Sequence, residues 1–134
     1  MQQVIYLKEN SDSIKNAKTI FDNISKIKVD YEQENFLVFF LDTRLEIIDT
    51  EVLFKGGLNS CLIDPKTIFR KALLKNSAAI IVSHNHPSRN LSPSSEDIES
   101  FNELKKIGEL LDLSVLDSII FDENKYYSLS ENDN

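Results

Sequence analysis

A continuous apolar run from Phe36 to Leu41 constrains the fold of this chain more than any other segment. The run reads Phe-Leu-Val-Phe-Phe-Leu, which is too short for a buried helix and rich in residues that favour β-strands. It therefore predicts a central strand covered on both faces. Such a strand needs a sheet with helices packed against it, and a chain of 134 residues is long enough for one domain of that kind.

The remaining pattern supplies the other elements of an α/β fold. Asp64 followed by Pro65 is a strong helix start, because a capping residue precedes proline at the first helical position. The predicted elements, in chain order, are an edge strand over 4–8, an amphipathic helix of about four turns over 14–27, strands over 36–41 and 45–54, a helix from 65, a strand over 78–82, a helix from 94, and strands over 115–121 and 126–129. After the first short strand, the order α-β-β-α-β-α-β-β predicts a mixed central sheet flanked by helices.

A single domain is expected to span residues 1–134. Residues 1–30 would contribute the first strand and helix, and residues 130–134 are expected to form a frayed tail. The helix from residue 94 is predicted to bury five apolar side chains, which are Ile98, Phe101, Leu104, Ile107 and Leu111.

Charge and composition exclude several classes of function. The net charge of −7 argues against broad binding to nucleic acid, although it does not exclude a local basic patch. No apolar run is long enough to span a bilayer, and the N-terminus lacks the pattern of a signal peptide. Cys61 is the only cysteine, which excludes an intramolecular disulfide and favours a cytoplasmic location. No membrane partner is expected, and the sequence does not indicate an oligomeric state.

The two histidines of the chain, His84 and His86, stand one residue apart directly after a predicted strand. Side chains at alternate positions of an extended backbone point to the same face, so both imidazoles can converge on one metal ion. Asp97, at the start of the following helix, could supply an oxygen ligand. Two nitrogens and one oxygen, with a fourth position open to water, form the ligand set of a catalytic zinc site. The carboxyl end of an inner strand is also where open α/β sheets place their sites.

Other residues around this segment have alternative interpretations. Ser94 followed by Asp97 before an apolar helix is also a capping box, and a capped first turn would fix the direction of the aspartate. A metal hydrolase needs a general base for its water. Glu32 and Glu34 stand just before the most apolar strand, but the chain has many carboxylates and spacing alone does not choose among them.

A family resemblance rests on these residues. His84-x-His86-Pro87 followed by Ser94-x-x-Asp97 resembles the JAMM motif of the JAB1/MPN metalloprotease superfamily, and residues 83–97 are most similar to its bacterial RadC-like branch. The similarity covers residues 30–130 approximately. Further matching phrases are Leu41-Asp42, Leu53-Phe54-x-Gly56, Leu58-Asn59-Ser60, Ala78-Ala79 and Val115-Leu116-Asp117.

The resemblance implies a fold, a cofactor and a reaction. The fold would be JAB1/MPN-like, with the layering of cytidine deaminases. His84, His86 and Asp97 would bind Zn²⁺, Ser94 would assist the transition state, and Glu34 would polarise the attacking water, with Glu32 as a weaker candidate. The protein would be a zinc-dependent metallopeptidase or isopeptidase that hydrolyses an amide bond in a protein or peptide substrate.

The resemblance also leaves an alternative, a noncatalytic MPN-type scaffold or DNA-repair accessory protein of the RadC type. The intact motif argues against a scaffold. The acidic charge argues against DNA binding, as does the short segment before Glu34, which suggests a stand-alone JAB domain. The branch usually has glycine where this chain has Arg89, and histidine where it has Ser118. These two departures affect the loop after the histidines and a contact near the site, and they remove none of the expected zinc ligands.

A nuclease and a deaminase receive little support from the sequence. The string His84-Asn85-His86 matches the name of the His-Asn-His nucleases only by coincidence, because their residues are dispersed over a longer motif. A zinc deaminase needs a Pro-Cys-x-x-Cys segment, which a chain with one cysteine does not have.

Overall fold

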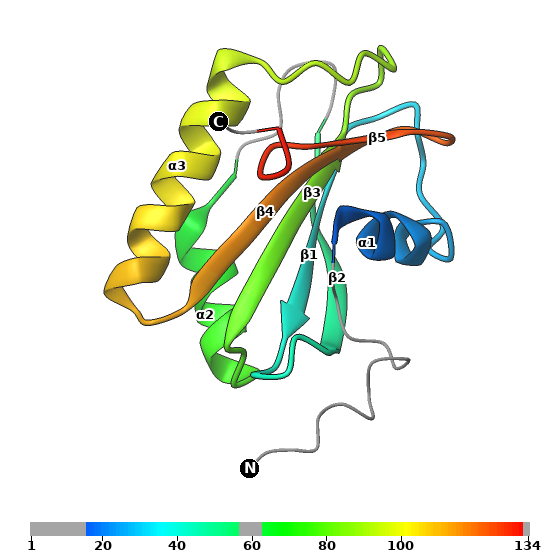
Figure 1. Cartoon of the computed structure of the whole chain (residues 1–134). Helices are drawn as coiled ribbons and strands as arrows, with labels where there is room; N and C mark the ends of the chain where they lie inside the picture. The colour runs from blue at the N-terminus through cyan, green and yellow to red at the C-terminus, as the bar shows by residue number, and fades with distance from the viewer. Residues whose placement is uncertain (1–15, 57–62, 133–134) are drawn as a thin grey trace.

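The computed structural model describes residues 16–56 and 63–132, which form a five-stranded mixed sheet with helices on both faces (Figure 1). The strand order is β2-β1-β3-β4-β5, in which β3 and β4 run parallel and the other neighbours run antiparallel. The elements are α1 (Ala17–Ile24), β1 (Asn35–Leu41), β2 (Ile47–Lys55), α2 (Pro65–Leu74), β3 (Ala79–Asn85), α3 (Ser95–Leu110), β4 (Ser114–Phe121) and β5 (Tyr126–Ser128). The predicted order and the mixed sheet are confirmed, whereas the edge strand expected over 4–8 lies outside the described residues.

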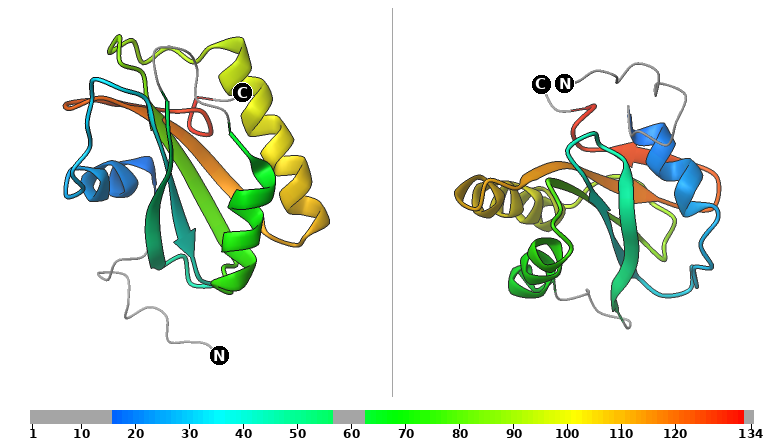
Figure 2. Two further views of the ribbon diagram at one scale, coloured as in Figure 1. Left: turned by 180° about the vertical axis from the view of Figure 1, so that it is seen from behind. Right: turned by 90° about the horizontal axis from the view of Figure 1, so that it is seen from below.

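The apolar run is buried on both faces, as predicted. Every residue of β1 is buried, and its side chains alternate between two hydrophobic clusters. Phe36, Val38 and Phe40 pack on the side covered by α2 and α3, and the residues between them pack on the side covered by α1. Figure 2 shows α2 and α3 together on one face of the sheet and α1 alone on the other. The strand in the middle of the sheet is β3, which pairs with β1 on one side and β4 on the other.

Helix α2 begins where the sequence predicts. The carboxylate of Asp64 accepts hydrogen bonds from the backbone of Lys66 at 3.1 Å and from the hydroxyl of Thr67 at 2.8 Å, and Pro65 occupies the first helical position. Helix α3 then provides the long crossover that two parallel neighbours such as β3 and β4 require.

Helix α1 is shorter than the sequence predicts. It covers Ala17–Ile24, with Asn16 as the cap that accepts from the backbone of Thr19 at 3.2 Å. Ile27 packs against the α1-side cluster although it follows the end of the helix. The apolar spacing that predicted a longer helix continues past Ile24, because the non-helical segment after α1 also buries an apolar side chain against the sheet.

The inner face of α3 also differs from the prediction. Phe101 and Leu104 are buried, but Ile98 and Leu111 are 45% and 41% exposed. The chain turns sharply after the helix, since Asp112 has a φ of 56°, and Leu113 enters the core instead of Leu111.

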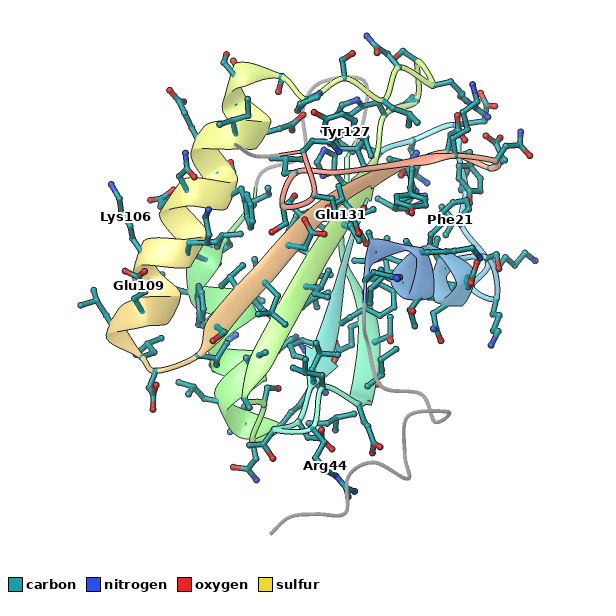
Figure 3. The ribbon with its side chains drawn as sticks, in the orientation of Figure 1. Phe21, Arg44, Lys106, Glu109, Tyr127 and Glu131 are labelled. Atoms are coloured by element: carbon teal, nitrogen blue, oxygen red, sulfur yellow. The ribbon has the colours of Figure 1, made fainter. Side chains whose placement is uncertain are left out.

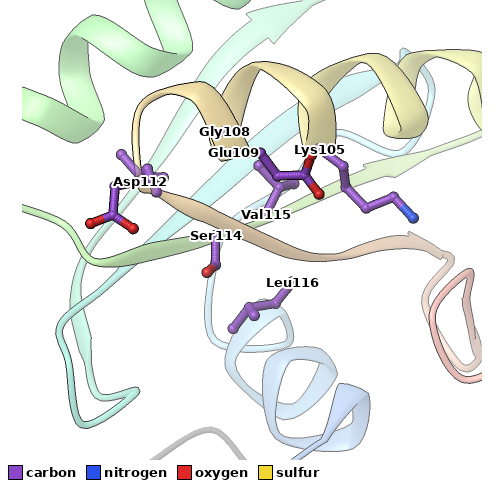
Figure 4. A pocket seen from close by; sticks show the side chains of 8 residues that line it. Lys105, Gly108, Glu109, Asp112, Ser114, Val115 and Leu116 are labelled. Carbon is purple, nitrogen blue, oxygen red and sulfur yellow. The ribbon is translucent and has the colours of Figure 1, made fainter.

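This turn depends on a close approach at Gly108 (Figure 4). A Cβ atom at this position would lie 2.3 Å from the carbonyl oxygen of Leu113 and 3.0 Å from Val115. Only glycine lets the end of α3 approach the start of β4 this closely. On the same helix, Lys106 and Glu109 are exposed (Figure 3).

Residues 130–132 form a hydrogen-bonded turn in the region where the sequence predicts fraying. The backbone N–H of Ser130 donates to Asp117 at 2.9 Å, and the carboxylate of Glu131 accepts from the backbone of Ala17 at 3.0 Å. The second contact attaches the end of the chain to the start of α1. Among residues 16–56 and 63–132, no helix combines the length and the apolar character needed to cross a membrane.

Candidate metal centre

His84 and His86 point to one site at the end of the middle strand. His84 is the second-last residue of β3 and His86 follows its end, so the extended backbone places both rings on the α3 side. Their Nε2 atoms lie 3.2 Å apart. The prediction that the two imidazoles converge is confirmed by this spacing.

Asp97 reaches the same site from the first turn of α3. Its Oδ1 lies 3.1 Å from Nε2 of His84, and its Oδ2 lies 3.2 Å from Nε2 of His86. Oδ2 also accepts a hydrogen bond from the backbone N–H of Ser94 at 2.8 Å. The capping box and the convergence on the histidines therefore occur together, because the cap directs the carboxylate toward β3.

The three side chains fit a metal ion. Their nearest donor atoms all lie within 4.8 Å of one another, and the distances from the carboxylate to the rings are 3.1 and 3.2 Å. Ligand atoms bound at zinc distances and tetrahedral angles lie roughly 3.3 Å apart. The three side chains are therefore close enough together to hold one ion.

The backbone after His86 sets the tautomer of that ring. Nδ1 of His86 donates to the carbonyl oxygen of Asn90 at 2.6 Å, so in the neutral ring the lone pair is on Nε2. A hydrogen bond of this kind is the usual outer contact of a metal-binding histidine. No pattern in the sequence indicates this role of Asn90, because its backbone carbonyl acts through the fold of the loop.

His84 has a different environment. It is 4% exposed, and its Nδ1 has no hydrogen-bond partner among the described residues. A cavity of about 10 Å³ adjoins the ring and is also bordered by Ser100 and Ser118. Apolar side chains line most of this cavity, and its volume is about the minimum for one water molecule.

The pKa values of His86 and Asp97 are shifted because the two groups lie close together. The hydrogen bond with Asp97 raises the pKa of His86 against the opposing effect of burial, and the nearby carboxylate of Glu34 acts in the same direction as Asp97. Burial raises the pKa of Asp97, but hydrogen bonds from His84 and His86 outweigh burial and hold it well below its usual range. A metal ion and a proton would thus compete for the same imidazole nitrogens.

Ser94 lies at the rim of the site as the N-cap of α3. Its Oγ accepts from the backbone N–H of Asp97 at 3.0 Å. That bond uses a lone pair of the hydroxyl, so the O–H can still act as a donor.

The structure separates the two candidate bases. Glu34 immediately precedes β1, and its charge acts on His86. The carboxylate of Glu32 is 85% exposed and lies 3.6 Å from the guanidinium of Arg89. Of the two carboxylates, Glu34 is the one whose charge raises the pKa of His86, whereas Glu32 is paired with Arg89.

Arg89 holds the loop that follows the histidines. Its guanidinium lies 2.7 Å from the carboxylate of Glu123 and donates to the backbone carbonyls of Tyr31 at 3.2 Å and Pro87 at 2.9 Å. Arg89 has a φ of 66°, a conformation that favours glycine. The sequence marked this position as a departure from the glycine of similar chains, but it did not indicate these contacts.

The chain is similar to proteins of one family. The model of the RadC-like JAB domain matches residues 14–134. A UPF0758 protein of Staphylococcus haemolyticus is 48% identical over 108 residues, which cover 81% of this chain and 47% of that protein. A UPF0758 protein of Methanosarcina mazei is 34% identical over 126 residues, which cover 94% of this chain and 55% of that protein. This chain thus spans about half the length of these relatives.

Proposed function

Because the chain belongs to the RadC-like JAB domain family, we propose that it is a metal-dependent hydrolase that cleaves an amide bond in a protein or peptide. The convergence of His84, His86 and Asp97 carries this proposal, since their donor atoms have the spacing of metal ligands. Zn²⁺ is the ion that we propose, because two imidazole nitrogens and one carboxylate oxygen are typical of catalytic zinc.

The proposed ligand set would not occupy every coordination position of the ion. Three protein ligands leave a tetrahedral ion with one open position for water or substrate. A bound Zn²⁺ would lower the pKa of a water molecule toward neutrality and polarise the carbonyl of the substrate.

Two further side chains would complete the reaction. The carboxylate of Glu34 would take a proton from the attacking water and deliver it to the nitrogen of the leaving amine. The hydroxyl of Ser94 would donate a hydrogen bond to the oxygen that becomes negative as water adds to the carbonyl. The carbon–nitrogen bond then breaks, and the products are a carboxylate and an amine. Cleavage of peptides compared with lysine-linked isopeptides distinguishes a main-chain amine from the amine of a lysine side chain.

The first experiment is elemental analysis of the purified protein beside a His84→Ala/His86→Ala double variant. We expect about one zinc per chain in the wild type and none in the variant. A wild-type protein that neither contains zinc nor takes it up would contradict the proposal.

The second experiment measures cleavage of a panel of peptides and lysine-linked isopeptides by the zinc-loaded protein. Glu34→Gln should abolish most of the activity and keep the zinc. Glu32→Gln is the matched control, since it removes the same charge two residues away and should keep the activity. Equal losses in both variants would argue against Glu34 as the base.

The alternative is a noncatalytic scaffold or DNA-repair accessory protein of the RadC type, which the family also permits. It predicts a protein that binds zinc but cleaves no member of the panel, with Glu34→Gln indistinguishable from wild type. Binding of duplex DNA at physiological salt would support the hypothesis of a DNA-repair accessory protein. The net charge of −7 argues against such binding.

A further inference from the structure

Asn85, the residue between the two histidines, directs its side chain away from the candidate metal centre. It is 1% exposed, and alternation along β3 places its amide on the face opposite His84. A buried amide needs hydrogen-bond partners, because leaving it unpaired costs free energy. The hydrogen-bond partners of the Asn85 amide therefore indicate what this residue does.

The amide of Asn85 binds both neighbours of Glu34. Its Oδ1 accepts from the backbone N–H of Asn35 at 2.8 Å, and its Nδ2 donates to the backbone carbonyl of Gln33 at 3.0 Å. The side chain of Asn35 joins the same network, because its Nδ2 lies 3.2 Å from Oδ1 of Asn85 and 3.0 Å from the carbonyl of Gln33. We call Asn35 and Asn85 the asparagine pair.

These contacts extend the sheet beyond its regular ladder. The pairing of β1 with β3 runs as far as Phe36 opposite His84. Past that point the side chain of Asn85 provides the donor and the acceptor that a backbone would otherwise provide. The carbonyl of Glu34 itself accepts from the backbone N–H of Gly56 at 2.7 Å. The backbone around Glu34 is thus held at three consecutive residues.

We propose that Asn85 is a positioning residue that aims the carboxylate of Glu34 at the site formed by His84, His86 and Asp97. This inference rests on the proposed function, in which Glu34 is the base. Side chains alternate along an extended segment, so holding Asn35 on the α1 side turns Glu34 to the α3 side, where the histidines lie. One residue of β3 thereby couples the position of the base to the positions of two ligands.

Asparagine suits this role chemically. A short planar amide offers an acceptor and a donor in fixed geometry, and both are used here. Aspartate would place a second acceptor against the carbonyl of Gln33, and an apolar residue would leave the backbone N–H of Asn35 unpaired and the carbonyl of Gln33 with the amide of Asn35 alone. A small displacement of a catalytic group matters, because an error of about 1 Å can cost about a hundredfold in rate.

The test compares Asn85→Ala with Ser83→Ala. Ser83 lies on the same face of β3 two residues earlier and is fully buried, and its hydroxyl has no partner among the described residues. It therefore controls for loss of a buried polar atom beside the ligands. Asn85→Ser, which keeps one hydroxyl, serves as a second variant if the alanine protein does not fold.

The first measurement needs neither metal nor substrate. In Asn85→Ala, amide hydrogen exchange at Asn35 should become about five- to tenfold faster, the factor expected for loss of one buried hydrogen bond. Exchange in the middle of β1 and β3 should be unchanged, as should exchange at Asn35 in Ser83→Ala. An unchanged rate at Asn35 in Asn85→Ala would overturn the inference.

The second measurement uses cobalt(II) as a paramagnetic probe in the metal centre. In wild type and Ser83→Ala, the side-chain signals of Glu34 should be broadened by the ion. In Asn85→Ala the broadening should fall several-fold, while cobalt affinity stays within about twofold. Equal broadening in all three proteins would overturn the inference even if the metal binds.

Kinetics distinguish positioning from a structural role. With any substrate that the wild type cleaves, Asn85→Ala should lower kcat by about ten- to a hundredfold and leave KM nearly unchanged. A changed KM with unchanged kcat would contradict positioning of the base. If the wild type cleaves nothing while the exchange and cobalt results hold, the proposed hydrolase function fails and the positioning of Glu34 stands.

Discussion

Nε2 of His84 lies 3.1 Å from Oδ1 of Asp97, although one residue ends a buried strand and the other begins the next helix. The loop between them carries His86 and is closed by the bond from its ring to Asn90. The capping box of α3 fixes the carboxylate at the other end. The candidate metal centre therefore takes its three side chains from the end of β3, the residue after it and the first turn of α3.

Asp97→Asn should separate the role of this residue as a proposed metal ligand from its role in the capping box of α3. The amide keeps the size of the carboxylate but loses its charge, so zinc affinity should fall by more than about a hundredfold. The metal-free protein should also lose about 1–3 kcal/mol of stability, because the change affects one helix cap, one charge near the helix dipole and the hydrogen bonds with His84 and His86. Competition with a chelator and chemical denaturation measure the two effects.

Glu96→Gln is the control for that variant, because it removes a charge from the same first turn. It should have a smaller effect on stability than Asp97→Asn and leave zinc affinity unchanged. Equal loss of affinity in both variants would show that net charge, rather than ligation, holds the ion.

The metal-free protein should be most stable in mildly acidic solution. The lowered pKa of Asp97 adds stability above its unfolded value of about 3.9, and this is lost as the pH falls. The raised pKa of His86 adds stability that is complete below its unfolded value of about 6.5 and lost as the pH rises through the higher folded value. The pair thus contributes most between about pH 4 and 6.5.

Zinc should reverse the alkaline part of this dependence. Metal binding needs a neutral imidazole, so the stabilisation by zinc should grow as the pH rises through the pKa of His86. Thermal unfolding between pH 4 and 9, with chelator and with zinc, measures both curves. In His86→Ala the metal-free curve should flatten on the alkaline side, and a curve identical to wild type would refute the assignment.

Arg89 presents a conflict between conformation and contacts. Its φ of 66° disfavours any residue with a Cβ atom, whereas its guanidinium holds Glu123 and two backbone carbonyls. Arg89→Ala loses the contacts and keeps the unfavourable conformation, but Arg89→Gly loses the contacts and relieves it. The glycine variant should therefore be more stable than the alanine variant by about 1 kcal/mol in urea denaturation. The reverse order would show that the loop changes its backbone when the guanidinium is removed.

Ser118 is expected to affect the metal centre through His84. Nδ1 of His84 is buried without a partner among the described residues, and the His84 residue lines a small cavity that Ser118 and Ser100 also border. A water molecule there would give the ring its missing partner. Ser118→Val should exclude that water and lower zinc affinity about tenfold, and Ser118→Ala should have a smaller effect. Zinc titration with a chromophoric competitor measures both, and wild-type affinity in the valine variant would exclude this role.

Much of the fold could be predicted because its signals are local. The apolar run at 36–41 identifies a strand buried on both faces, and Asp64-Pro65 and Ser94 identify two helix starts. The wrong details have local causes too. The end of α1 was misplaced because Ile27 continues the apolar spacing outside the helix. The buried face of α3 was misjudged because a turn at Asp112 moves Leu113 into the core.

For the candidate site too, some features could be predicted from local sequence and others depended on the tertiary structure. By itself, the sequence determined that His84, His86 and Asp97 are candidates for one metal site, because two alternate histidines and a helix-capping aspartate are recognisable from their spacing. Only the tertiary structure decided how the rest of the chain surrounds them. It paired Glu32 with Arg89, turned the amide of Asn85 to the backbone beside Glu34, and left Nδ1 of His84 buried without a partner among the described residues. Those relationships join segments far apart in the chain, and contacts of that kind are set by packing rather than by local spacing.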